Sequence, residues 1–347
     1  MRYIGSKAAS LQLIARAIHA ERHQYASICD PFAGTCTVAR HFKSMGLRAI
    51  TGDLLRLSYV LQKAYIELSS PPCFDGLFNS GVLGKRVPSM EPHVVVLRHL
   101  NALPGRHGYL TNNYSPAGAA KRLFFSCENA MRLDRIRAEI DTWAAGLLNE
   151  DEEAYLLACL LEAADRIANT AGTYYAYLKH FYRKALKPLQ MIPIPISSNS
   201  RRNCANQADA SALLERVRTD VVYLDPPYND RDYGSYYHLP EALARRAYPK
   251  PKGVSGMSAL PSPRSAFCRA ETAYQAFENL VSEVQCRCLA VHYSTDGLIS
   301  HRDILRALRG RGRTRYVTWS VRKYVSRPGA EHTTSTSASR LYICRIA

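Results

Sequence analysis

The sequence lacks long apolar runs and paired cysteines. Its 347 residues contain no stretch of about 18 apolar residues, which excludes a transmembrane helix. The N-terminal segment, MRYIGSKAASLQLIARAI, alternates polar and apolar residues and has no signal-peptide core. The ten cysteines are scattered and form no CxxC pair, which argues against a disulfide framework and against a zinc site. We therefore expect a cytoplasmic protein with reduced thiols.

Acidic residues are also scarce. Lys and Arg number 46 against 29 Asp and Glu, so the formal net charge is +17. Residues 171–202 hold six basic residues and no acid, and residues 301–347 carry a net +9, whereas residues 130–166 hold nine acids against four arginines. Such segregation suits a groove that follows phosphates, but a solvated basic face explains it equally well. Charge alone leaves a polyanionic partner as a hypothesis.

The order of elements predicts an α/β fold. Residues 25–30 and 47–54 are expected strands on either side of a helix at 38–46, and residues 221–224 continue the sheet. Further helices are expected at 11–18, 273–285 and 299–310, with strands at 288–294, 316–325 and 340–346. Residues 121–184 are expected to be mostly helical, with Gly172 near the end of a long helix. The segments expected to be irregular are 71–110, a linker at 193–203 and a mobile loop at 248–265.

The sequence Asp225-Pro226-Pro227-Tyr228 follows the apolar strand VVYL, at the place where open α/β sheets bind ligands. These residues suit methyl transfer to an exocyclic amine such as adenine N6, whose lone pair is delocalised into the ring. Asp225 and the Pro226 carbonyl would accept the two N6 hydrogen bonds, and Tyr228 would stack on a flipped base. A surface turn is the alternative, since Asp-Pro-Pro also suits a turn. The preceding strand and the following Asn229 favour a functional site.

A second motif, DPFAGTCT, leads from a strand into a helix through small residues. Such a turn lets a ligand approach the backbone closely. An ordinary βα turn is nearly as good an explanation, because Cys36 stands where a second glycine is usual. Asp53 ends the next strand, 23 residues after Asp30, which is the spacing of an acid that holds ribose hydroxyls. Together the two features indicate a nucleotide site more strongly than either does alone.

With these motifs in order, the sequence resembles the DNA adenine-N6 methyltransferases of the Dam-like (D12) class. The matching stretches are Met1 to Lys7 (MRYIGSK), Asp30 to Thr37, Asp53, Asp209 in NQADAS, and Asp225 to Tyr228. Segments such as NYSPAG, LLEAADRIANTAGTYYAYLK and HYSTDGLIS extend the resemblance over most of the chain. The DPPY and RYIGSK elements are specific to the class, whereas the glycine loop alone is not.

The resemblance implies transfer of a methyl group from S-adenosylmethionine to N6 of a flipped adenine in duplex DNA, without a metal. It implies a Rossmann-like catalytic α/β domain in residues 1–70 and 195–347, with a mainly helical target-recognition insertion at 71–194. The catalytic residues implied are Asp225, Pro226, Pro227 and Tyr228. The cofactor-binding residues implied are Tyr3, Gly5, Lys7, Asp30, Phe32, Ala33, Gly34, Cys36, Asp53, Asp209 and Asp225.

The sequence departs from the class at two places. Cys36 replaces a glycine that admits the methionine moiety, which leaves open a weakened cofactor site or an inactive relative. The loop at 248–265 is less recognisable than the rest, and no site residue is assigned to it.

Candidate DNA contacts come from the insertion and from the C-terminal segment. Asn112 and Asn113, beside Tyr114, could read base edges, and an Asx-rich turn explains them equally well. The tyrosines at 174, 175, 177 and 182 could either stack on DNA or pack in the core. The candidate phosphate contacts, each with solvated surface as its alternative, are Arg122, Lys179, Arg183, Lys184 and Lys187. Arginines 306, 309, 311, 313 and 315 suit either phosphate or a helix dipole. The acidic stretch 130–166 is expected to face away from DNA.

Double-stranded DNA is thus the expected partner, with no membrane partner and a monomer or weak dimer as the assembly. Whether a cognate restriction endonuclease exists stays open. The alternatives are an RNA or protein amine methyltransferase with the same motif, or a catalytically silent DNA-binding relative. A nuclease or a helicase has no support, because the sequence shows neither a metal-binding carboxylate cluster nor a P-loop.

Overall fold

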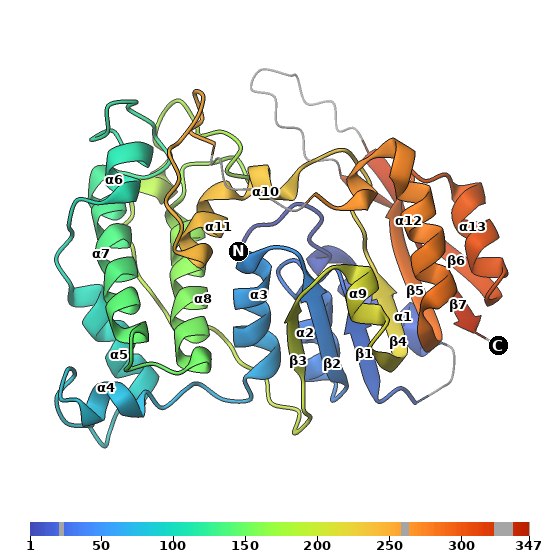
Figure 1. Ribbon diagram of the computed structural model, residues 1–347, viewed down its shortest axis with the longest axis horizontal. Coiled ribbons are helices and arrows are strands. Elements are labelled where there is room, and N and C mark those ends of the chain that lie inside the picture. The colour runs from blue at the N-terminus through green and yellow to red at the C-terminus, as the bar shows by residue number, and fades with distance from the viewer. Residues whose placement is uncertain (21–23, 258–263, 323–335, 347) are drawn as a thin grey trace. The chain divides into compact units, whose positions relative to one another are not determined.

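The computed structural model describes residues 1–20, 24–257, 264–322 and 336–346, and it divides into two compact units (Figure 1). Unit 1 comprises Met1–Gly5, Leu55–Ser198 and Tyr233–Ser262, and unit 2 comprises Ser6–Leu54, Asn199–Asp232 and Pro263–Ala347. Unit 2 contains the sheet, whereas the regular structure of unit 1 is helical. The predicted α/β class is confirmed.

The described strands of unit 2 form one seven-stranded sheet in the order β3-β2-β1-β4-β5-β7-β6. The first five strands in this order are parallel, and β7 runs antiparallel to both β5 and β6. The bounds are β1 Ser27–Asp30, β2 Arg48–Asp53, β3 Cys204–Gln207, β4 Arg218–Leu224, β5 Gln285–Ser294, β6 Gly312–Arg322 and β7 Thr336–Ile346. The chain order reverses between β1 and β4, and a doubly wound sheet binds its ligands beyond the carboxyl ends of the strands at such a point.

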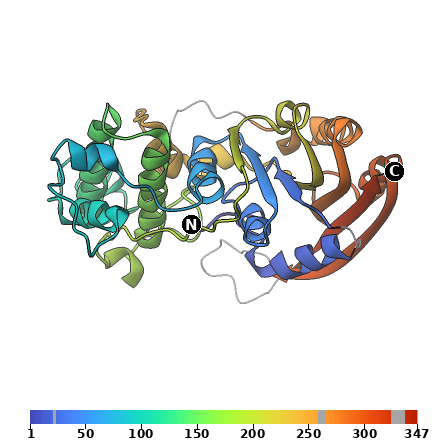
Figure 2. The ribbon, with the colours of Figure 1, turned by 90° about the horizontal axis from the view of Figure 1, so that it is seen from below.

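Helices cover both faces of the sheet (Figures 1 and 2). One face carries α1 (Leu11–His19) and α2 (Thr37–Ser44), and the other carries α9 (Ala210–Leu214), α12 (Ala270–Glu283) and α13 (His301–Arg309). The core on the second face includes Val222, Phe277, Leu289 and Tyr342. Because β4 is covered on both faces, its sequence VVYL is continuously apolar and fully buried.

Unit 1 is built around two long helices, α7 (Cys127–Ala144) and α8 (Glu150–Ile167). Helix α8 starts with a capping box between Asn149 and Glu152, and its buried side chains lie on nearly every side. The other helices of unit 1 are α3 (Arg56–Gln62) with a π-helical extension at Lys63–Glu67, α4 (Asp75–Asn79), α5 (Pro92–Ala102), α6 (Tyr109–Tyr114), α10 (Tyr233–Tyr236), α11 (His238–Arg245) and a 3-10 turn at Arg183–Leu186. No described helix is long and apolar enough to cross a membrane.

The boundaries of the compact units differ from the predicted domain boundaries. Residues 1–5, 55–70, 195–198 and 233–262, expected in the catalytic domain, belong to unit 1. The reason is the packing of α3 against α8 and α11. The buried Glu241 on α11 accepts hydrogen bonds from the N–H groups of Arg56 (3.1 Å) and Leu57 (2.8 Å), which begin α3. A carboxylate at a helix N-terminus is stabilising, so α3 is fixed to α11.

Two predictions of local structure are wrong. Residues 71–110 were expected to be irregular but contain α4 and α5, two short helices that lie between stretches rich in Pro and Gly. The long helix expected to reach Gly172 ends at Ile167, and residues 168–182 contain no helix. There Asn169 replaces helical bonding: its side chain donates to three carbonyls, of Leu123 (2.9 Å), Leu178 (3.0 Å) and His180 (3.1 Å). Parts of two other predicted segments, residues 258–263 and 323–325, lie outside the described residues.

Candidate active site

Four acids follow four neighbouring parallel strands of unit 2. Asp30 and Asp53 end β1 and β2, Asp209 lies two residues beyond β3, and Asp225 lies one residue beyond β4. Because these strands are adjacent and parallel, their carboxyl ends meet at one edge of the sheet. We call Asp30, Asp53, Asp209 and Asp225 the strand-end acids. The sequence motifs predicted each of them separately, and the fold brings them to one edge.

Lys7 makes the principal ion pair of this edge. Its Nζ lies 2.5 Å from Asp225 Oδ2, with 10% of the Lys7 side chain and 17% of the Asp225 side chain exposed. The other carboxylate oxygen, Oδ1, lies 3.6 Å from Nδ1 of His292. Burial lowers the pKa of His292 well below its usual value, and the charge of Lys7 lowers it further, so this histidine is neutral. Lys7 therefore supplies the positive charge beside the DPPY carboxylate.

Burial and neighbouring charges shift the pKa values of two of the strand-end acids. Burial, the negative charge of Asp225 and, more weakly, that of Asp53 raise the pKa of Asp30 to about 8, against the lowering effects of the Phe32 N–H and Lys7. Burial also raises the pKa of Asp225, and Lys7 opposes that rise. Clustered acids with perturbed pKa values are a feature of functional sites.

The turn after β1 is held by two of these acids. Asp30 Oδ1 accepts a hydrogen bond from the Phe32 N–H at 3.2 Å, and Asp53 Oδ2 accepts one from the Gly34 N–H at 2.9 Å. Gly34 has a φ of +50°, which glycine adopts without strain. Ala33 donates its N–H to the Gly52 carbonyl at 3.0 Å. The predicted residues Phe32, Ala33 and Gly34 thus form a turn fixed to the ends of β1 and β2.

Cys36 occupies a position that favours glycine. Its φ is +61°, in the left-handed region, and it precedes the first residue of α2. The residue is fully buried, and burial raises the pKa of its thiol well above the usual value. Its side chain therefore lies in the interior of unit 2 and is not part of the exposed surface of the turn.

The DPPY motif leaves β4 at the same edge. Pro226 is buried, and Pro227 and Tyr228 are half-buried. The Tyr228 ring packs edge-on against Tyr293, with centroids 6.3 Å apart, and its carbonyl accepts the Leu298 N–H at 3.0 Å. These contacts hold the predicted stacking residue against the end of β5.

Sequence reasoning missed three residues behind Asp225. His292, on β5, stacks on Trp319 of β6 with centroids 5.2 Å apart, and its Nδ1 lies 3.3 Å from the hydroxyl of Tyr223 on β4. Trp319 is fixed in turn, because its indole N–H donates to the Ser10 hydroxyl at 3.2 Å. The available signal was the HYS sequence that ends β5, the strand next to β4.

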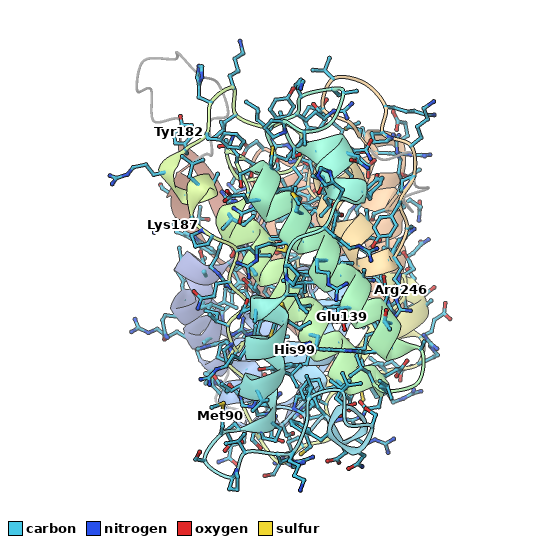
Figure 3. The ribbon with its side chains drawn as sticks, turned by 90° about the vertical axis from the view of Figure 1, so that its left-hand side faces the viewer. Met90, His99, Glu139, Tyr182, Lys187 and Arg246 are labelled. Atoms are coloured by element: carbon cyan, nitrogen blue, oxygen red, sulfur yellow. The ribbon has the colours of Figure 1, made fainter. Side chains whose placement is uncertain are left out.

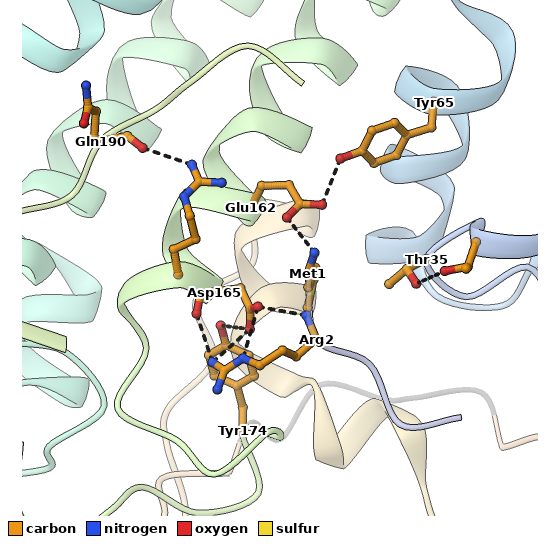
Figure 4. Close-up of polar contacts among 10 residues, drawn as sticks. Met1, Arg2, Thr35, Tyr65, Glu162, Asp165, Tyr174 and Gln190 are labelled. Carbon is orange, nitrogen blue, oxygen red and sulfur yellow. Dashed lines mark hydrogen bonds and ion pairs between the residues drawn. The ribbon is translucent and has the colours of Figure 1, made fainter. Parts of the chain in front are cut away.

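Tyr3 and Gly5 of the N-terminal motif belong to unit 1. Tyr3 stacks on Tyr237 with centroids 4.5 Å apart, and the Ile4 N–H donates to the Tyr237 hydroxyl at 2.6 Å. The preceding residue, Arg2, binds Asp165 of α8 through its backbone N–H at 2.8 Å and its guanidinium at 3.2 Å (Figure 4). The N-terminal motif is therefore anchored in unit 1 through Arg2 and Tyr3, and in unit 2 through Lys7.

The phosphate contact predicted for Arg122 is not supported by its placement. The side chain is buried, and its guanidinium donates to three backbone carbonyls, those of Val254 (2.9 Å), Asn113 (2.9 Å) and Gly253 (3.0 Å). Bonds at Nε, Nη1 and Nη2 leave it poorly placed to bind a phosphate, so its role is structural.

The other predicted DNA contacts of unit 1 differ in their exposure and in their hydrogen bonds. Asn112 and Lys179 are exposed, whereas the Asn113 amide donates to the Tyr109 carbonyl at 2.9 Å and Lys184 Nζ donates to the Thr170 carbonyl at 3.2 Å. Of the tyrosine run, Tyr174 is buried, Tyr177 is half-buried and Tyr175 is exposed. Tyr182 and Lys187 are also exposed and flank the 3-10 turn (Figure 3).

Several charged side chains outside the site are bonded within the molecule. Of the C-terminal arginines, Arg311 donates to the Val284 carbonyl at 2.7 Å and Arg315 to the Ala17 carbonyl at 2.6 Å, while Arg309 and Arg313 are exposed. In the acidic stretch 130–166, Asp165 binds Arg2, and Arg246 pairs with Asp141 (2.9 Å) and Glu153 (2.6 Å). Much of this stretch therefore stabilises unit 1 instead of forming a solvated acidic face.

Comparison with known proteins identifies the family. A family model for the D12 class N6 adenine-specific DNA methyltransferases matches residues 3–292, which include Tyr3 to Lys7 of the N-terminal motif, all four strand-end acids and His292. The chain belongs to this D12 class. The matched range contains the DPPY sequence and the strand-end acids, which lie on the doubly wound sheet.

Several curated type II methyltransferases are similar to this D12 chain. The type II methyltransferase M.FokI of Planomicrobium okeanokoites is 37% identical over 314 residues, which cover 90% of this chain and 47% of that protein. The modification methylase StsI of Streptococcus sanguinis is 36% identical over 313 residues, 89% of this chain and 46% of that protein. The chain thus spans about half the length of these two relatives. The type II methyltransferase M.NlaIII of Neisseria lactamica is 35% identical over 78% of this chain and 76% of its own length.

The buried Asp30 carboxyl predicts a pH dependence of stability. The pKa of Asp30 in the folded chain, about 8, lies above that of an unfolded Asp. The contribution of Asp30 to the free energy of unfolding is therefore complete below about pH 4 and is lost as the pH rises through about 8. Urea denaturation at pH 5, 7 and 9 measures the free energy of unfolding. Between pH 5 and pH 9, this free energy should rise by at least about 1 kcal/mol in the Asp30→Asn variant relative to the wild type.

Glu271→Gln, which changes an exposed acid on α12, is the control and should keep the wild-type pH profile. If the free energy of unfolding changed with pH in the same way in the wild type and in Asp30→Asn, the raised pKa of Asp30 would be contradicted.

Proposed function

We propose that this chain transfers a methyl group from S-adenosylmethionine to N6 of adenine in duplex DNA. The observation that carries the proposal is the position of Asp225 at the end of β4, paired with Lys7 and beside the strand ends of Asp30, Asp53 and Asp209, in a chain of the D12 class. M.FokI and StsI are about twice as long as the part that this chain matches. The activity and partners of this chain are therefore a proposal and are not taken from those proteins.

The accessible strand-end acids suit the cofactor's nucleoside. Asp53 is half-buried and Asp209 is exposed, so a ligand at this edge can reach both carboxylates. Asp53 would hold the ribose hydroxyls, and Asp209, which also caps α9, would lie beside the adenine. The buried Asp30 would act through the turn that it fixes. S-adenosylmethionine supplies the methyl group on a positively charged sulfonium, which a cluster of acids favours electrostatically.

The DPPY residues would orient the acceptor amine. Lys7 opposes the effect of burial on Asp225 and so favours the ionised carboxylate, which accepts an N6–H. The Pro226 carbonyl would accept the second N6–H, and Tyr228 would stack on the flipped base. Holding both hydrogens localises the nitrogen lone pair, so these residues make the amine nucleophilic. His292 lies beside Asp225 and stacks on Trp319, so it would help to hold the carboxylate in place.

Duplex DNA is the proposed partner, and residues 71–194 are the proposed target-recognition region. The support is the family match and the exposed cationic and aromatic side chains of this region, including Lys179, Tyr182 and Lys187. Relatives named as type II methyltransferases and modification methylases also support a role in restriction–modification, with a cognate endonuclease as a further partner.

Replacing the Asp225 carboxylate tests the assigned chemistry. In Asp225→Asn the amide retains the shape but loses the charge that pairs with Lys7, so methyl transfer to duplex DNA should fall at least about 100-fold in kcat, with a much smaller change in KM for DNA. The measurement is incorporation of tritiated methyl groups into plasmid DNA free of N6-methyladenine. Glu271→Gln is the matched acid-to-amide control and should retain wild-type kcat.

Structured RNA and a glutamine-containing peptide are assayed in parallel with the wild type. Preferred methylation of either one would replace the DNA proposal by the corresponding alternative. Activity that persists in Asp225→Asn would overturn the role given to the carboxylate.

The placement of Cys36 predicts its effect on cofactor binding. Because the residue is fully buried below the turn, Cys36→Gly should change the Kd for S-adenosylmethionine by less than about threefold, or about 0.7 kcal/mol. Isothermal titration calorimetry measures both proteins. Binding at least tenfold tighter in the glycine variant would show that the cysteine crowds the cofactor. Absence of binding in both would favour a catalytically silent relative.

A further inference from the structure

Residues 249–257 of unit 1 form an ordered turn outside the site described above. Lys252 and Met257 make an antiparallel bridge, with the Lys252 N–H donating to the Met257 carbonyl at 2.9 Å, and the Gly256 N–H donates to the Gly253 carbonyl at 3.2 Å. Gly253 and Gly256 both have a φ of +67°, which most other residues avoid. The sequence Gly-Val-Ser-Gly therefore makes a tight turn with Val254 near its tip. We call residues 249–257 the GVSG loop.

Arg122 fixes the backbone of this loop. Its guanidinium donates to the carbonyls of Val254 at 2.9 Å and Gly253 at 3.0 Å, and to that of Asn113 at 2.9 Å. The fit is close, because a Cβ on Gly256 would lie 2.7 Å from the Arg122 guanidinium carbon. Arg122 thus joins the GVSG loop to the C-terminal end of α6.

Two tyrosines of α6 add further hydrogen bonds. The hydroxyl of Tyr114, which is fully buried, donates to the Gly256 carbonyl at 2.7 Å, and the hydroxyl of Tyr109 donates to the Pro249 carbonyl at 2.7 Å. Side chains therefore hold four carbonyls of the loop in place. A loop ordered in this way loses little conformational entropy when it binds a partner.

The surroundings of the loop are cationic. Lys121, Lys250 and Lys252 are exposed, and within the described residues no carboxylate pairs with Arg122. Neither the sequence from 242 to 270 nor that from 92 to 127 contains Asp or Glu. Both segments thus carry no acid of their own, and the Asp134 carboxylate that approaches α6 is buried and bonded to the Leu110 and Thr111 N–H groups. The exposed charges on and beside the loop are therefore the lysines, which favours an anionic partner.

The tip of the loop is apolar. Val254 is 84% exposed, the highest value among the large apolar side chains of the described residues. A single exposed valine is ordinary on a protein surface. Val254, however, lies on a backbone that buried side chains hold in place, and lysines flank it. One apolar side chain is too small an area for a stable protein interface. An apolar tip flanked by cations suits a nucleic-acid groove, where phosphates flank apolar sugars and base edges.

We propose that the GVSG loop is a DNA-contact element in which Lys250 and Lys252 bind phosphates and Val254 packs against sugars or base edges in a groove. The inference rests on the proposed function and adds to it a contact element outside residues 71–194. Arg122 is a positioning residue in this account, because it acts on DNA through the loop backbone.

Substitution at the tip tests the apolar contact. Val254→Asp should raise KM for plasmid DNA free of N6-methyladenine about tenfold with kcat within twofold, and the nearly isosteric Val254→Thr should raise it about threefold. The control is Val82→Asp, which adds the same charge at another exposed valine of unit 1 and should leave KM unchanged. Equal KM values for wild type, Val254→Asp and Val82→Asp would overturn the proposal.

Removing the two lysine charges tests the binding of phosphates. In the double variant Lys250→Gln/Lys252→Gln, the slope of log Kd against log salt concentration for the same DNA should fall by about 1.8, because each phosphate that a lysine neutralises adds about 0.9 to that slope. An unchanged slope would contradict phosphate binding by these lysines.

Cross-linking identifies the partner at the tip. A benzoylphenylalanine placed at position 254 should form photo-cross-links to DNA, and one at position 82 should not. Cross-links from position 254 to a second copy of the chain, or to neither partner, would overturn the proposal. A wild-type chain that does not methylate DNA would refute the proposed function, whereas full methylation by all loop variants would refute only the loop's role.

Discussion

The ion pair between Lys7 and Asp225 is the interaction on which the site depends. Asp225 is mostly buried at the end of β4, near the Asp30 carboxyl and against a neutral His292. Burial raises the pKa of both carboxyls, that of Asp30 to about 8, so Asp30 is the one that favours the protonated form near neutral pH. Lys7, from within the N-terminal motif, opposes this rise in pKa at both Asp225 and Asp30. The order of the strands then determines where the accessible acids, Asp53 and Asp209, lie relative to this pair.

Buried charged groups bonded to backbone atoms are a second recurring feature. Glu241 accepts the N–H groups that start α3, Asp134 accepts those of Leu110 (2.9 Å) and Thr111 (2.8 Å) in α6, and Arg122 donates to carbonyls of the GVSG loop. Each joins segments that are distant in sequence. A buried charge is costly unless it is satisfied, so these contacts strongly favour one arrangement of the chain. They also explain why much of the charge that looked available for DNA in the sequence is used within the fold.

The sequence predicted the parts of the molecule whose signals are local. The strand before DPPY, the βαβ unit and the acids at strand ends follow from apolar runs, turn residues and spacing. The short helices α4 and α5 were missed because Pro- and Gly-rich stretches surround them, and the end of α8 because side-chain bonds of Asn169 replace helical ones. The roles of His292 and Arg122 depend on contacts between residues 67 and 132 positions apart in the sequence, as in Asp225–His292 and Arg122–Val254. Composition and periodicity carry no information about such contacts.

The central claim is that the strand-end acids and the Lys7–Asp225 pair form a site for adenine N6 methylation. Single-molecule sequencing of DNA from cells that express this chain, with cells expressing Asp225→Asn as the reference, tests it most directly. The account predicts N6-methyladenine at one recurring sequence context in the wild-type DNA and its loss in the reference. Absence of N6-methyladenine from the wild-type DNA, or its equal presence in both, would contradict the account.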